Sequence, residues 1–214
     1  DSLGAEYVYS VEQGVTWNVG GRDLAQITLT GFNSWWIDAI VPTFASHNGD
    51  SMLWYAGDSA RIQTNINADQ ATIRGARIEA RAKLFPRIQA EAAVNWTLGT
   101  NRDSEAPLAH IPPVFGRVSV VYQHRWLTVQ AYSLFNGAKA VADYGPAGED
   151  NLDEALPSGT PAWYTLNLES TAQLHEHLQV RLGVRNLLDE HYRVFSSGIS
   201  GAGRGFFTSV HASF

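Results

Sequence analysis

Apolar and polar residues alternate with a period of two along nearly the whole chain. The clearest segment is ARIEARAKL, residues 76–84, in which small or branched apolar side chains alternate with full charges. Successive side chains of a β-strand point to opposite faces of its sheet, so this segment predicts a strand with one apolar and one charged face. Residues 88–98 repeat the alternation after a short turn, and the two segments together predict a β-hairpin.

The same pattern predicts nine strands. They are expected at residues 7–19, 25–39, 76–84, 88–98, 117–123, 127–135, 163–172, 178–185 and 204–214. In the last of these, RGFFTSVHASF, the alternation continues to the final residue and places Phe214 on the apolar face. A strand that keeps its pattern to its end is expected to have partners along its whole length.

The connections between the predicted strands alternate in length. Short connections are expected at residues 20–23, 85–87, 124–126 and 173–177. Long, polar connections that contain glycine and proline are expected at residues 41–61, 100–113, 136–162 and 196–203. An antiparallel meander with short turns on one rim and long loops on the other is typical of an outer-membrane barrel, whose short turns are periplasmic.

Alternation alone does not say which face meets water. In a soluble β-sandwich or a lipocalin-like barrel the apolar face would be the core, whereas in a membrane barrel the two faces are exchanged. On the apolar face the large aromatic residues gather near the strand ends, and smaller aliphatic residues fill much of the middle. They are Tyr7, Tyr9, Trp17, Trp35, Trp96, Tyr122, Phe135, Tyr164, Phe206 and Phe214. Two aromatic girdles around an aliphatic band favour the membrane barrel.

Composition narrows the choice of partners. The formal net charge of −6 gives no basic field, which argues against a nucleic-acid partner. The sequence has no cysteine, so it has neither disulfides nor thiolate metal sites. No GxSxG nucleophile motif or recognisable pair of catalytic carboxylates occurs, so an enzyme on a small outer-membrane barrel is a weaker alternative, with no catalytic residues to name.

The number of strands also indicates whether the chain can form a closed barrel by itself. Nine antiparallel strands place the two chain ends on opposite rims, whereas a single-chain bacterial barrel normally has an even number of strands. The chain is therefore expected to be the terminal part of a longer barrel whose other strands precede Asp1, unless the strand count is wrong by one. In the first case Phe214 lies in the strand that closes the barrel against the absent first strand.

Four segments resemble the TonB-dependent outer-membrane receptors. They are RLGVRNLLDEHYRVFSSGISGAGRGFFTSVHASF (181–214), SVEQGV (10–15), IRGARIEARAKL (73–84) and IPPVFGRVSVVY (111–122). The resemblance implies a bacterial outer-membrane barrel of roughly 22 strands with a plugged lumen. Residues 1–214 would form its C-terminal portion, without the plug domain, the earlier strands or the TonB-contacting box, so this chain by itself should not transport.

The resemblance also implies a function and a set of partners. Such a receptor imports a scarce ligand, such as a ferric siderophore, haem, cobalamin or another metal chelate, with energy supplied through TonB. The expected partners are outer-membrane lipid, the receptor's own plug and remaining strands, the TonB complex and the small-molecule ligand. No cofactor is expected.

Two groups of residues are candidates for contact with the ligand or the plug. In the external loops they are His47, Trp54, Tyr55, His110 and Tyr144. On the charged face, which would line the lumen, they are Arg77, Glu79, Arg81, Lys83, Glu91, Arg181 and Arg185. A solvated barrel wall with weak cross-strand ion pairs is the alternative for the second group. The sequence HEH at 175–177 falls in a predicted short turn and is interpreted as solvated, so no metal site is expected.

Overall fold

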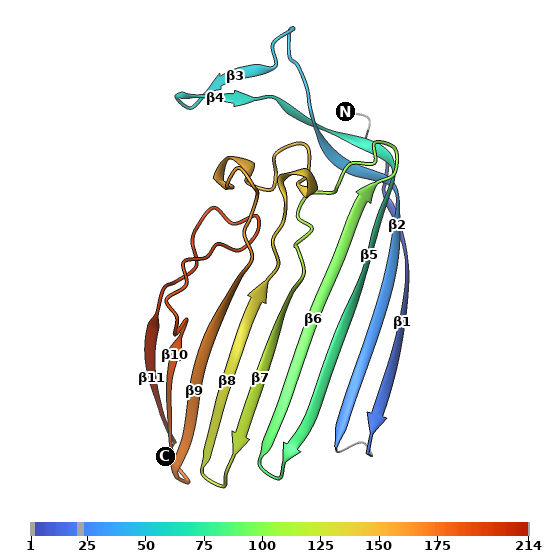
Figure 1. The fold of residues 1–214 in the computed structure, drawn as a ribbon. Helices are drawn as coiled ribbons and strands as arrows, with labels where there is room; N and C mark the ends of the chain where they lie inside the picture. The colour runs from blue at the N-terminus through green and yellow to red at the C-terminus, as the bar shows by residue number, and fades with distance from the viewer. Residues whose placement is uncertain (1–2, 21–23, 214) are drawn as a thin grey trace.

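Nine strands form one antiparallel sheet in the computed structural model, which describes residues 3–20 and 24–213 apart from the side chains of Ala68 and Asp69 (Figure 1). Their spatial order is β1-β2-β5-β6-β7-β8-β9-β10-β11, and each strand pairs with the next one along the chain apart from a small hairpin between β2 and β5. The strands are β1 (Tyr7–Val19), β2 (Ala25–Phe44), β5 (Gln63–Phe85), β6 (Ile88–Asn101), β7 (Phe115–Gln123), β8 (Leu127–Asn136), β9 (Trp163–His175), β10 (Leu178–Arg185) and β11 (Gly205–Ala212). The nine-stranded antiparallel meander predicted from the sequence is confirmed.

The second and third strands of the sheet are much longer than the sequence pattern predicts. Their pairing continues from Ala39 opposite Ala68 to Phe44 opposite Gln63, a region expected to be mostly loop. The alternation of apolar and polar residues is lost there because both faces carry polar side chains such as Thr64 and Asn65. A ladder of backbone hydrogen bonds needs no alternation where both of its faces meet water.

The connection between these strands, expected to be an irregular loop, contains a two-stranded hairpin. Its strands are β3 (Met52–Tyr55) and β4 (Asp58–Arg61), which pair only with each other. The turn between them places Ala56 and Gly57 at positive φ, as a two-residue hairpin turn requires. The connection between β8 and β9 contains two short 3₁₀ helices, η1 (Val141–Asp143) and η2 (Leu152–Glu154).

Short turns lie at one end of the sheet and long loops at the other (Figure 1). Strand β1 begins at the end with the long loops, and β11 finishes at the end with the short turns. This arrangement agrees with the predicted parity. Phe214 and most of the short connection at residues 20–23 lie outside the described residues. No helix among the described residues is long and apolar enough to cross a membrane.

The burial of the two faces is the reverse of that in a water-soluble sheet. Large apolar side chains such as Val118, Val120 and Leu168 are 43–44% exposed. On the opposite face, polar side chains of β7 and β9 are buried, and Ser119 and Glu169 expose only 3% and 8% of their surface, whereas the charged side chains of β5 on that face are exposed. No second sheet packs on the apolar face of the described strands, so a sandwich is not formed. An apolar surface of this extent fits apolar surroundings.

The two edge strands β1 and β11 each have a neighbour on one side only. Their outer edges therefore present backbone N–H and C=O groups that no described strand pairs with. Unpaired backbone groups are costly in hydrocarbon, where water cannot replace the missing partner.

Candidate functional site

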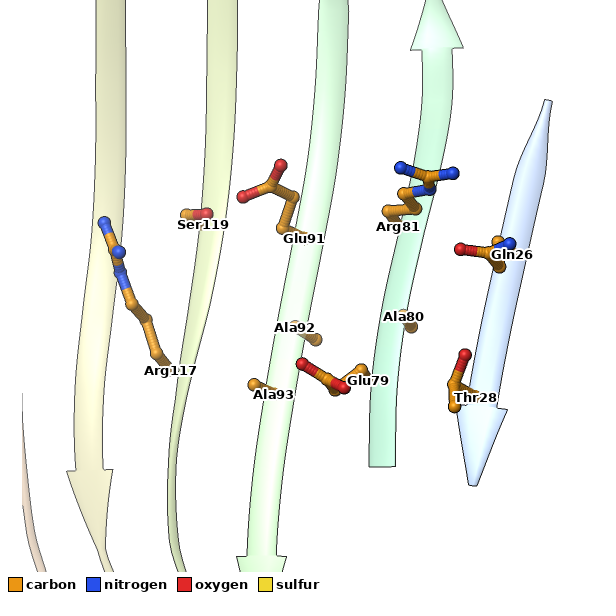
Figure 2. Close-up of a pocket in the computed structure, with 10 residues that line it drawn as sticks. All are labelled: Gln26, Thr28, Glu79, Ala80, Arg81, Glu91, Ala92, Ala93, Arg117 and Ser119. Carbon is orange, nitrogen blue, oxygen red and sulfur yellow. The ribbon is translucent and has the colours of Figure 1, made fainter. Parts of the chain in front are cut away.

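The polar face of the sheet carries a recess of about 370 Å³ across β2, β5, β6 and β7 (Figure 2). Arg81 and Glu91 stand at paired positions of β5 and β6 and both line it. Glu79 accepts a hydrogen bond from Arg77 of the same strand at 2.7 Å, and both side chains are about half exposed. Since Arg117 of β7 also lines the recess, charges of both signs surround a space open to water.

A denser cluster lies on the same face across β7 to β11, around the carboxylate of Glu169. The Tyr132 hydroxyl donates a hydrogen bond to Glu169 Oε1 at 2.9 Å, and Arg181 donates one to Oε2. Arg185 Nε lies 3.6 Å from Oε1. The Glu169 side chain is 9% exposed, whereas the two arginines are about half exposed or more. Three side chains from two neighbouring strands therefore hold one carboxylate.

Aromatic rings extend this cluster on both sides. The Arg117 guanidinium lies 4.4 Å from the centre of the Tyr132 ring, a cation–π distance. The guanidiniums of Arg181 and Arg185 lie 5.5 and 4.8 Å from the centre of the Phe207 ring of β11. At Glu169 itself, one carboxylate faces the guanidiniums of Arg181 and Arg185.

Gly183 makes room for the cluster. It pairs with Glu169 on one side and with Phe207 on the other, so it occupies the middle of their row. A Cβ atom at this position would lie 2.5 Å from the Phe207 ring and 3.1 Å from Glu169 Cγ. The absence of a side chain lets the ring lie over the glycine between the two arginines.

Three of the long connections meet above the sheet at the buried carboxylate of Asp150. The side chain of Asp150 is fully buried and accepts hydrogen bonds from the backbone N–H groups of His110 and Gly145, each at 2.7 Å. His110 Nδ1 lies 3.3 Å from Ser196 Oγ, and Asn151 Nδ2 donates to the Ser196 carbonyl at 2.8 Å. His110, Asn151 and Ser196 all have positive φ, which requires such local support in residues with a side chain.

A second buried group ties the same loops together. Lys139 Nζ donates to the Ile111 carbonyl and lies 4.6 Å from the centre of the Phe195 ring. Burial lowers the pKa of Lys139, and the carboxylates of Asp150 and Asp143 act in the opposite direction. The loops between β6 and β7, β8 and β9, and β10 and β11 therefore share one packed core, which we call the loop core.

Comparison with known proteins assigns this architecture to a family. The family model described as TonB dependent receptor-like, beta-barrel matches residues 1–187. The chain belongs to the TonB-dependent receptor family. Receptors of this family are outer-membrane proteins, so the exposed apolar face of the sheet meets lipid and the polar face meets the lumen.

Solved receptor structures have the same fold. The chain superposes on the copper transporter OprC with a TM-score of 0.81 at 18% identity, covering 100% of this chain and 32% of that one. It superposes on the FrpB iron transporter from Neisseria meningitidis with a TM-score of 0.72 at 16% identity, covering 100% and 31%. A variant of the ferric enterobactin receptor from Pseudomonas aeruginosa gives 0.71 at 18% identity, covering 99% and 32%. The chain thus spans about a third of each. No curated protein matches the sequence.

The residues predicted to face the lumen lie on the polar face. Glu79, Arg81 and Glu91 line the larger recess, and Lys83 lines a smaller one of about 110 Å³ nearby. Arg181 and Arg185 meet at Glu169, which the sequence reasoning missed, as it missed Tyr132 and Phe207. One signal was available, since Glu169 is the only formally charged residue of β9. Whether any of these side chains contacts a ligand or a plug stays a prediction.

The residues predicted to contact ligand in the loops fall into two groups. Trp54 and Tyr55 lie in β3 and are 73% and 72% exposed, and His47 lies nearby, paired with Asp50 through backbone hydrogen bonds of 2.9 and 3.1 Å. His110 and Tyr144 belong to the loop core. Tyr144 is only 5% exposed, and its hydroxyl lies 2.5 Å from Thr160 Oγ1. Among the described residues, no group of three histidine and carboxylate side chains could hold a metal ion.

Replacing Asp150 by alanine should loosen the loop core without unfolding the barrel. The change leaves the N–H groups of His110 and Gly145 without their buried acceptor. We expect this to raise the equilibrium constant for local opening of the loops by about tenfold or more. We expect protease added to intact cells to cut residues 137–162 about ten times faster in Asp150→Ala. Asp153→Ala is the matched control, because Asp153 is exposed in the same loop. Equal cleavage of the two variants would contradict the prediction.

Proposed function

We propose that this chain forms part of the wall and the external loops of a receptor that imports a scarce ligand across the outer membrane with energy supplied through TonB. The observation that carries the proposal is the polar face with its charged, water-accessible recess, because a polar inner wall behind a lipid-facing apolar surface suits a water-filled path. Membership of the receptor family supports the same function.

Each part of the chain has a role in this proposal. The external loops capture the ligand, with Trp54 and Tyr55 offering exposed aromatic surface at the hairpin. The polar face forms one side of the lumen. The free edges of β1 and β11 pair with further strands of the same receptor, and a plug domain inside the barrel gates the path when TonB pulls on it.

The proposed ligand class is a metal chelate, namely a ferric siderophore, haem, cobalamin or a related complex. Structures with the same fold are named as a copper transporter, an iron transporter and a ferric enterobactin receptor, which supports a metal-containing cargo. Large planar or aromatic chelates would find stacking partners in Trp54 and Tyr55.

Uptake by whole cells tests this function. Cells that carry the complete receptor should accumulate one member of a panel of radiolabelled metal chelates, and a protonophore that collapses the inner-membrane gradient should stop uptake while leaving binding intact. A receptor that takes up none of the panel, or takes it up equally after the protonophore, would contradict the proposal.

The aromatic residues of the hairpin give a second test of the same proposal. The double variant Trp54→Ala with Tyr55→Ala should lower binding of the transported chelate by about tenfold or more, since exposed Trp and Tyr commonly dominate binding surfaces. Trp126→Ala is the control, because Trp126 is 51% exposed but belongs to the short turn between β7 and β8. That turn lies at the opposite end of the sheet from the hairpin (Figure 1). Unchanged binding of the chelate in the double variant would show that the hairpin is not part of the capture site.

A further inference from the structure

Polar and cationic side chains interrupt the apolar face near the loop end of the sheet. Strand β5 presents Ala76 and Ile78 on this face, and the next outward position toward the loops is Arg74. The register pairs Arg74 with Asn33 of β2 and Leu98 of β6. One row further toward the loops, Thr72 pairs with Trp35 and Thr100. A guanidinium on the lipid-facing side therefore has hydroxyl and amide groups beside it.

Arg102 adds a second guanidinium to this place. Its backbone N–H donates to the Gln70 carbonyl at 2.9 Å, which continues the ladder of β5 and β6 by one step. Arg74 and Arg102 line a recess of about 440 Å³ together with Asn33, Trp35 and Thr100. Trp35 also lines an adjoining groove of about 400 Å³ with Tyr9 and Ile37. A cationic recess and an aromatic groove therefore share one tryptophan.

The depth of Arg74 can be estimated from the strand geometry. An apolar band about 25 Å tall, crossed by a strand tilted about 40°, corresponds to roughly 33 Å of strand, or about 10 residues at about 3.4 Å each. Ile88 pairs with Tyr122 and Phe85 near the short turns and marks the periplasmic side of the band. Ten residues along β6 from Ile88 is Leu98, the partner of Arg74. Arg74 therefore lies at the outer edge of the band, and Arg102 lies just beyond it.

No carboxylate whose side chain the structure describes, a set that leaves out Asp69, lies within 4.0 Å of the guanidinium of Arg74 or Arg102. Glu105 lines the same recess, and the nearby Asp103 carboxylate accepts the backbone N–H of Gln70 at 3.2 Å. Two exposed arginines with hydroxyl neighbours at headgroup depth form a site complementary to an anion.

We infer that this recess binds the phosphorylated headgroup of a lipid in the outer leaflet. Arg74 and Arg102 donate to the phosphate oxygens, and the hydroxyls of Thr72 and Thr100 are close enough in the register to add donors. The groove between Tyr9, Trp35 and Ile37 takes the apolar part of the lipid next to the headgroup, as interfacial aromatic rings do. The lipid would thus contact the outer surface of β1, β2, β5 and β6.

Native mass spectrometry of the complete receptor with added lipid A tests this inference, because lipid A carries both phosphates and acyl chains. The double variant Arg74→Gln with Arg102→Gln should weaken retention of lipid A by about tenfold or more. Glu105→Gln should strengthen it, because that change removes a negative charge from the recess. Arg74→Lys, which keeps the charge, should retain most of the binding and shows that loss of folding is not the cause.

Two controls define the result that would overturn the inference. Arg77→Gln with Arg81→Gln removes the same charge from the opposite face of β5 and should leave lipid A retention unchanged. Equal loss in the two double variants would show a non-specific effect of charge. Dephosphorylated lipid A should be retained equally by the wild-type protein and by the double variant Arg74→Gln with Arg102→Gln. Displacement of lipid A by millimolar inorganic phosphate would mean a site for free anions, and the lipid assignment would then be wrong.

Discussion

Replacing Ala92 by arginine should destabilise the folded receptor by about 2–4 kcal/mol, whereas the same change at Ala93 should alter its stability by less than about 1 kcal/mol. The two residues are neighbours in β6 and start from the same side chain, so the only variable is the face. Ala92 is level with Ala80 and Val118 on the lipid-facing side. Ala93 pairs with Glu79 and Arg117 on the lumenal side.

The expected difference follows from where each new guanidinium can be solvated. At Ala92 the charge enters near the middle of the hydrocarbon band, since Ala92 lies about midway between Ile88 and Leu98. At Ala93 it enters the water-accessible recess, where Glu79 is close enough to offset the repulsion from Arg117. Urea unfolding of the complete receptor in phosphatidylcholine vesicles measures both variants.

The control for side-chain size is leucine at each position. Ala92→Leu should be tolerated, because lipid accepts another apolar group, and Ala93→Leu should cost little more than Ala93→Arg. If arginine is tolerated equally at both positions, or is worse at Ala93, the assignment of the lipid-facing side is wrong. The proposed lipid site and the proposed lumen would be wrong with it.

The period-two pattern predicts the strands of the sheet because the two faces of each strand meet different surroundings. Within the lipid band an outward side chain must be apolar and an inward one can be polar, so residues such as Ala92 and Glu91 reveal their faces without reference to any other strand. Above the band both faces meet water. The pattern therefore ends near Ala39, although the pairing of β2 with β5 continues to Phe44 and Gln63.

The Glu169 cluster was only half predictable for a related reason. The spacing of Arg181 and Arg185 places both on one face of β10, which the alternation shows directly. Their meeting with Glu169 depends on the register between β9 and β10, which shifts at Leu178 and Gln179. A shift of one residue in a register changes which side chains meet across strands, and alternation within one strand does not report it.

The contacts of the loop core could not be predicted from the sequence at all. Asp150, Asp153 and Glu154 belong to one acidic stretch, and the sequence gives no reason to separate them. The structure buries Asp150 and leaves the other two exposed, because backbone N–H groups of His110 and Gly145 converge on Asp150. Since His110 lies 40 residues away and is held at positive φ, no local pattern could indicate this contact.

The Glu169→Gln variant should lose about 1.5–3 kcal/mol of stability, whereas Glu79→Gln should lose less than about 1 kcal/mol. Both carboxylates bond to arginine on the polar face, but they differ in burial. The Glu169 side chain is 9% exposed and has partners in Tyr132, Arg181 and Arg185, whereas that of Glu79 is 49% exposed and, among the side chains that the structure describes, bonds to Arg77 alone. The amide of glutamine keeps only one acceptor oxygen, so its NH2 group meets donors at one of the two positions, and both guanidiniums lose their counter-charge.

The expected loss is smaller than the value for removing one partner of a fully buried ion pair, because Arg181 and Arg185 are 48% and 62% exposed and water can solvate them. A double-mutant cycle measures the coupling energy between Glu169 and Arg181 separately from the other contacts of each residue. Arg181→Gln should cost about 1 kcal/mol or more in the wild-type background and much less when Glu169 is already glutamine. A coupling energy near zero would mean that Glu169 is held by Tyr132 and by packing over Gly183, and that the arginines near Phe207 are free to bind something else in the lumen.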